Sequence, residues 1–183
     1  PVALIARALV ATVAVFVFFE LLPHFTVGVS EVHFILGSSL FLILGAAPAA
    51  IGLALGLLLQ GMLLAPTDLP QYAMNVTTLL VPLFALQAIA ARVIAPGTAY
   101  VDLSYRQVVA LSASFQGGTV AWVAFWAFYG QGFGAENVSS VMAFGAAYMT
   151  VVLIEPLLDL GLLAGAKAMR DNKLFTPRLH NAA

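Results

Sequence analysis

Two histidines near the start of the chain, His24 and His33, have the side chains best suited to bind a transition metal. Neutral imidazole is a common ligand for such metals. Ser30 fits the N-cap of a helix that begins at about Glu31, and this places His33 in the first turn. A helix N-terminus disfavours imidazolium, so the position favours metal binding. The alternative is a histidine that simply bonds to water or backbone. His24, in a predicted turn, is the less favoured second ligand.

Polar side chains that could support such a site fall within otherwise apolar segments. They are Gln60, Asn75, Thr77 and Thr78, near the expected depth of His33. Polar groups there either orient a ligand or hydrogen-bond one helix to another. The neighbouring glycines Gly117 and Gly118 predict a small-residue surface for close helix packing.

Glu155 and Asp159 are one helical turn apart and would share a face of the last apolar segment. Acids inside apolar segments are costly and are usually functional. Pro156 between them invites a kink. We expect both acids toward the end of the bundle opposite His33, with Asp159 close enough to the membrane surface to be hydrated. A packing, partner-contact or coupling role is favoured over a proton relay.

The elements that must position these residues are apolar helices in a membrane. The chain has 183 residues, of which 62% are hydrophobic and 8% are charged, whereas soluble domains carry about 25% charged residues. The net charge of −1 gives no basic face for nucleic acid. The absence of cysteine excludes disulfides, iron–sulfur clusters and thiolate metal sites. No Walker A, GxSxG or HExxH motif occurs, so neither an enzyme nor an organic cofactor is predicted.

The predicted fold is an all-α, polytopic transmembrane bundle of about six helices. Residues 1–166 form the single helical domain, and residues 167–183 form a polar tail. The apolar segments are residues 8–22, 31–47, 49–64, 74–93, 107–129 and 138–164. A span needs about 20 residues. The second and third segments are short, with a corner at Pro48, and are either two thin spans or one hairpin that enters and leaves the same face.

Charge predicts the orientation of the bundle. In this topology one side holds all seven basic residues: Arg7, Arg92, Arg106, Lys167, Arg170, Lys173 and Arg178. The other side holds Glu20, Glu31, Asp68 and Glu136. The positive-inside rule makes the basic side cytoplasmic. We therefore expect a multi-pass protein of a bacterial-type inner membrane, with Pro1, Ala183 and the tail cytoplasmic and His33 outward.

Three stretches of the sequence resemble a known family. They are Val32-His33-Phe34-Ile35-Leu36-Gly37, the leucine-rich run that ends at Gln60-Gly61, and Ala73-Met74-Asn75-Val76. Together they resemble the cobalt/nickel membrane components of energy-coupling-factor transporters, the CbiM/NikM family, over residues 32–80. Ile154-Glu155-Pro156 is similar to the family's Ile-Glu-Gly in the last helix, and Thr78 stands where the family has a second Asn.

The resemblance implies a divalent metal, Co(II) or Ni(II), as the transported substrate. The family binds it in a planar nitrogen site, and His33 matches the helical histidine of that site. The other ligands of the family site come from a Met-His N-terminus, which must lie outside. Because the charge rule places Pro1 inside, we expect an additional helix upstream and seven helices in the intact protein. The implied partners are a second transmembrane subunit and cytoplasmic ATPases, beside the lipid bilayer itself. The alternatives are a non-catalytic subunit of a larger membrane complex, or a channel or intramembrane enzyme that uses Glu155 and Asp159.

Overall fold

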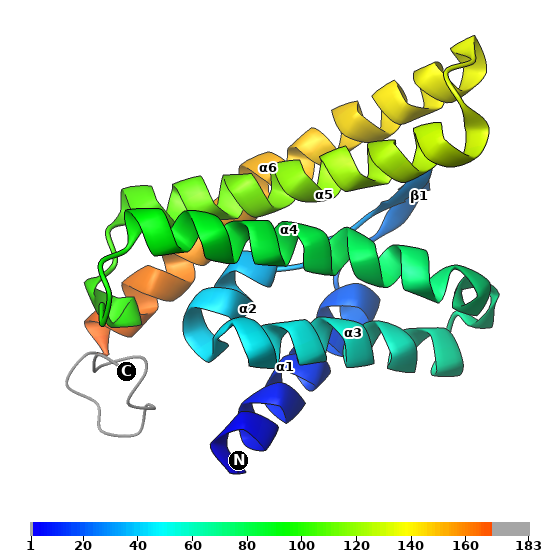
Figure 1. Cartoon of the computed structure of the whole chain (residues 1–183). Coiled ribbons are helices and arrows are strands. Elements are labelled where there is room, and N and C mark those ends of the chain that lie inside the picture. The colour runs from blue at the N-terminus through cyan, green and yellow to red at the C-terminus, as the bar shows by residue number, and fades with distance from the viewer. Residues whose placement is uncertain (1, 170–183) are drawn as a thin grey trace.

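The computed structural model describes residues 2–169, which form a helical bundle with one small β-hairpin (Figure 1). The remaining tail residues, including Arg170, Lys173 and Arg178, lie outside this range, as does Pro1. The elements in order are α1 (Val2–Leu21), β1 (Phe25–Val27), β2 (Ser30–Val32), α2 (Gly37–Leu44), α3 (Ala46–Leu63), the 3-10 helix η1 (Pro66–Gln71), α4 (Tyr72–Val93), the 3-10 turn η2 (Tyr100–Asp102), α5 (Tyr105–Gln131) and α6 (Ala135–Ala168).

Within residues 2–169, five helices are long and apolar enough to cross a membrane: α1, α3, the combined η1–α4, α5 and α6. The prediction of a multi-pass helical bundle is confirmed. The sixth helix, α2, has 8 residues. At 1.5 Å per residue it is roughly 12 Å long, well short of a hydrocarbon core of about 30 Å.

The helix expected over residues 31–47 is wrong in its first part. Residues 25–32 form an antiparallel hairpin, in which Ser30 pairs with Val27. Ser30 is therefore not an N-cap, and His33 lies in extended chain between β2 and α2. β-branched residues favour a strand, and Gly28 with φ of 57° supplies the turn. The corner before α3 is made by Gly45, with φ of 98°, and Pro48 lies inside α3.

Helices α1 and α3 run parallel to each other, so the chain that joins the end of α1 to the start of α3 must return across the bundle. Gly52 contacts Ala11, and Gly56, one turn later, contacts Val15. At their starts, the Arg7 Nη1 donates to the Leu44 carbonyl at 3.2 Å. Seven residues of extended chain cover roughly 23 Å, so residues 30–36 together with α2 are long enough for this return.

The later helices are antiparallel neighbours, which lie side by side in Figure 1. The indole nitrogen of Trp126 donates to Thr77 at the start of α4, and Gln107 donates to Val93 at its end. Asn137 at the start of α6 donates to Ala127 near the end of α5. The starts of α1 and α3 and the end of α6 therefore lie at one end of the bundle, here called the basic end. The opposite end carries the β-hairpin and is called the hairpin end.

The short helix α2 lies in the middle of the bundle, in contact with α3, α4, α5 and α6. Its first six residues are all buried. Gly37 allows this packing, because a Cβ added there would lie 2.2 Å from the ring of Phe115. In α5, Gly118 approaches Pro82 closely as the small-residue surface predicted, but Gly117 faces open space.

Candidate functional site

A cavity of about 660 Å³ opens at the hairpin end, where every long helix and the hairpin contribute to its wall. The hairpin closes one side, because a Cβ at Gly28 would lie 2.1 Å from the Ser140 carbonyl oxygen of α6. The polar side chains that line the cavity are those of Thr26, Ser30, Glu31, His33, Gln60, Asp68, Gln71, Asn75, Thr78, Thr119, Gln131 and Tyr148, with the indole of Trp126. The cavity is therefore a polar chamber within an apolar bundle.

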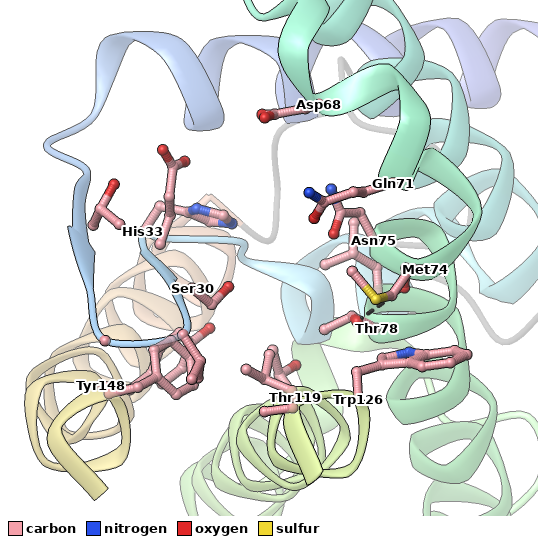
Figure 2. Close-up of a pocket in the computed structure, with 18 of the residues that line it drawn as sticks. Ser30, His33, Asp68, Gln71, Met74, Asn75, Thr78, Thr119, Trp126 and Tyr148 are labelled. Atoms are coloured by element: carbon pink, nitrogen blue, oxygen red, sulfur yellow. Dashed lines mark hydrogen bonds between the residues drawn. The ribbon is translucent and has the colours of Figure 1, made fainter. Parts of the chain in front are cut away.

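His33 is half-buried in the wall of this cavity. Its ring packs against Phe19 of α1, with ring centroids 4.6 Å apart. Figure 2 shows the imidazole pointing across the cavity toward Gln71 and Asn75. His33 lies before α2 and not in its first turn, so the helix N-terminus expected from the sequence does not act on the imidazole as predicted.

The structure brings His33 together with three of its predicted supporting residues. Gln60 of α3 and Asn75 and Thr78 of α4 line the same cavity. The Thr78 hydroxyl donates to the Met74 carbonyl at 3.0 Å (Figure 2), so its oxygen can still accept a hydrogen bond. Thr77 lies outside the lining, and it instead accepts hydrogen bonds from Trp122 and Trp126.

His24 is exposed and does not line the cavity. Its Nδ1 lies 3.2 Å from the Leu22 carbonyl oxygen, within the turn that joins α1 to the hairpin. The geometry gives it no position among the polar groups that face His33.

The sequence reasoning missed two acids of the cavity, Glu31 and Asp68, and one further amide, Gln71. Glu31 follows Ser30 in β2, and Asp68 and Gln71 belong to η1. No Lys or Arg is present among the described lining residues, so the two carboxylates make the cavity attractive to cations. The predicted topology already put Glu31 and Asp68 on the same side of the membrane as His33, and this shared position could have indicated them as site residues. The described chain has no group of three or more His, Cys, Asp or Glu residues that could hold a metal. Any metal there would combine imidazole with amide or carboxylate oxygens.

The surroundings expected for Glu155 and Asp159 are wrong, although both lie in the half of α6 nearer the basic end. Both carboxylates are 0% exposed, so Asp159 is not hydrated at the membrane surface. Glu155 accepts hydrogen bonds from the backbone amides of Ile35 and Leu36, only two and three residues after His33. Asp159 accepts from the hydroxyls of Ser38 and Ser39 at the start of α2. These residues meet because the chain between α1 and α3 returns through the bundle. The simple bundle of spanning helices expected from the sequence does not contain this return.

Comparison with known families shows a match that covers most of the chain. Residues 4–172 match the CbiM family, described as the cobalt uptake substrate-specific transmembrane region. No curated protein and no solved structure matches the chain.

Proposed function

The chain belongs to the CbiM family, a transmembrane component of cobalt uptake, and we propose that it is the subunit that binds the metal, with His33 as the principal ligand. The substrate is Co(II), and the same ligand chemistry suits Ni(II). Imidazole nitrogen is a good donor for both ions, and amide or carboxylate oxygens are acceptable additional ligands.

The observation that supports this proposal is the imidazole of His33 in the wall of a cavity that two carboxylates make negative. Metal binding requires an unprotonated ring nitrogen, and the ring of His33 faces the cavity (Figure 2). Glu31 and Asp68 would attract a divalent cation to the cavity, and Gln60, Asn75 and Thr78 would then bond to the ion or to its water ligands. His24, which is exposed and outside the cavity, is not included as a ligand.

The basic end of the bundle would face the cytoplasm. Arg7, Arg92, Arg106 and Lys167 all lie there, which agrees with the positive-inside rule for a bacterial-type inner membrane. The cavity would then open to the outside, where an uptake protein meets its substrate. Residues 1–166 would act as one membrane domain, with residues 167–183 as a cytoplasmic tail.

Transport against a gradient requires an energy source, and the sequence carries no nucleotide-binding motif. We therefore propose that this component works within an energy-coupling-factor transporter, with a second transmembrane subunit and cytoplasmic ATPases. The chain itself would not be an enzyme.

The test is isothermal titration of the intact protein in detergent with Co(II) and Ni(II), comparing wild type with His33→Ala. Wild type should bind, and His33→Ala should lose measurable binding while it keeps the thermal unfolding midpoint of wild type. His24→Ala is the matched control, because it removes an imidazole from the exposed turn, and it should bind as wild type does.

Titration with Mg(II) separates the histidine site from a purely acidic one. Mg(II) prefers oxygen ligands, so it should bind weakly and equally to wild type and His33→Ala. Equal Co(II) binding by wild type and His33→Ala would refute the assignment of His33. No Co(II) binding by the intact wild type would instead favour a non-catalytic subunit of a larger membrane complex.

A further inference from the structure

The chain between β2 and α2 is held by a single carboxyl group from the last helix. Glu155 of α6 is fully buried, and each of its two oxygens accepts a hydrogen bond from a backbone amide. Ile35 donates to Oε2 at 3.1 Å, and Leu36 donates to Oε1 at 2.7 Å. Both amides lie outside β2 and α2, so neither belongs to a strand or helix ladder.

These two hydrogen bonds hold a backbone conformation that is uncommon for its residues. Leu36 has φ of 52°, the only positive φ among the described non-glycine residues. Residues other than Gly, Asn and Asp rarely adopt this left-handed region. The surrounding structure must therefore impose the conformation, and the shorter of the two Glu155 bonds is made by Leu36 itself.

Irregular backbone inside a membrane protein is tolerated only where its polar groups are satisfied by protein or line a cavity. Glu155 meets this need directly two residues beyond His33. On the other side of His33, β2 pairs with β1, and the ring itself packs against Phe19. The place of the imidazole in the cavity wall is thus determined by β2 before it, by Phe19 beside it and by Glu155 after it.

Asp159 makes a chemically different contact one turn further along α6. It accepts hydrogen bonds from the hydroxyls of Ser38 and Ser39, inside α2. A hydroxyl can donate or accept, so these two partners can adjust when the group opposite changes. A backbone N–H can only donate, so the partners of Glu155 cannot adjust.

From this geometry we propose that Glu155 is a positioning residue for metal binding: its carboxylate holds the backbone of residues 35 and 36 and thereby fixes the His33 imidazole in the cavity. This inference rests on the proposed function, in which His33 is the metal ligand. It assigns to Glu155 a role within the outward-facing site, although Glu155 itself touches no substrate.

The test uses two variants that are nearly identical in shape to the native side chains, Glu155→Gln and Asp159→Asn. The amide of Glu155→Gln presents an NH₂ group to one of the two backbone N–H donors, so one of these bonds must break. Loss of a group that orients a metal ligand typically weakens metal affinity by about 10- to 100-fold. We expect Glu155→Gln to weaken Co(II) binding by at least about tenfold. Asp159→Asn should bind as wild type does, because Ser38 or Ser39 can accept from its NH₂ group.

The visible d–d absorption of bound Co(II) distinguishes positioning from a general loss of stability. At saturating metal, Glu155→Gln should show an altered spectrum, because the imidazole approaches the ion from a changed position, whereas Asp159→Asn should keep the wild-type spectrum. Glu155→Asp retains two acceptor oxygens on a shorter side chain and should fall between the two. It replaces Glu155→Gln in the comparison if the latter does not fold in detergent.

Each result bears on one of the two proposals. If His33→Ala loses Co(II) but Glu155→Gln keeps both the affinity and the spectrum, the positioning role is wrong and the metal site stands. Equal weakening by Glu155→Gln and Asp159→Asn, with unchanged spectra, would also overturn the positioning role, since both acids would then only stabilise the fold. If His33→Ala binds as wild type does, the proposed function fails and this inference fails with it.

Discussion

Residues 22–45 and helix α6 both connect the two ends of the bundle, but they satisfy their backbone polar groups differently. Helix α6 has 34 residues, and away from its ends and Pro156 its N–H and C=O groups bond within the helix. Residues 22–45 combine a hairpin, extended chain and one short helix. Part of their hydrogen bonding comes from side chains elsewhere in the chain, above all Glu155 and Asp159. The irregular region depends on its neighbours, and it is the region that carries His33.

The difference also explains why α6 contains two buried acids without an adjacent Lys or Arg among their hydrogen-bonding partners. Glu155 and Asp159 are satisfied by amides and hydroxyls at the N-terminal end of α2. A helix N-terminus carries partial positive charge and stabilises nearby carboxylates. The buried acids of α6 therefore gain hydrogen-bond donors, and the donors of residues 35–39 that the irregular segment does not pair itself gain acceptors.

The largest expected effect tests whether residues 22–45 truly return across the membrane. Single cysteines at Val2, Ala95 and Ala135 can be labelled selectively, because the chain has no native cysteine. All three positions are exposed. In intact cells an impermeant maleimide should label Ala135→Cys and leave Val2→Cys and Ala95→Cys unlabelled, since the parallel packing of α1 and α3 puts Val2 at the basic end.

The control is to permeabilise the membrane before labelling, which should make all three cysteines reactive. Labelling of Val2→Cys together with Ala135→Cys in intact cells would mean that residues 22–45 do not return. Labelling of Val2→Cys and Ala95→Cys without Ala135→Cys would mean that residues 22–45 do cross the membrane, but that the protein has the opposite orientation to the one proposed.

A second prediction concerns the close packing that the irregular segment requires. Gly37→Ala would place a methyl group 2.2 Å from a ring carbon of Phe115, which is itself fully buried. Overpacking of this kind typically costs about 1–3 kcal/mol. The variant should unfold at a lower temperature in detergent. It should also bind Co(II) more weakly, because α2 begins only four residues after His33 and must shift to make room for the methyl group. An unchanged unfolding midpoint would show that Phe115 can move aside.

Hydropathy alone could predict the regular part of the fold. The segments predicted over residues 49–64, 74–93, 107–129 and 138–164 correspond to α3, α4, α5 and α6, with differences at their ends. Runs of apolar residues are long in these helices and report directly on burial in lipid. The first helix was also predicted, although it begins at Val2 rather than near residue 8.

The irregular part could not be predicted in the same way. Residues 31–47 are apolar enough to look like a span, yet they contain only the short helix Gly37–Leu44 and the first two residues of α3. Strand pairing of residues 25–32 depends on contacts with α6 at Gly28, which a local pattern does not contain. The helix cap expected at Ser30 failed for this reason.

The candidate site was predicted in part. His33, Gln60, Asn75 and Thr78 line one cavity. The sequence could predict this because the order of the apolar segments puts all four residues at the same end of the bundle. Glu155 was expected far from His33, since its depth was counted along α6 without the return of the chain beside it. The contact between residues 35 and 155 is set by tertiary packing, and nothing in either local sequence specifies it.

The smallest expected effect belongs to a glycine in the regular region, and it completes the comparison with Gly37. Gly117 is two residues from Phe115 in α5, but a Cβ added there would meet nothing within 4 Å. Glycine inside a helix is less favourable than alanine by about 0.5–1 kcal/mol. Gly117→Ala should therefore leave the unfolding midpoint unchanged or raise it slightly, and it should leave Co(II) affinity as in wild type. A fall comparable to that of Gly37→Ala would indicate that this exposed face of α5 is covered in the membrane by another protein surface rather than by lipid, because only a close neighbour would make one methyl group costly there.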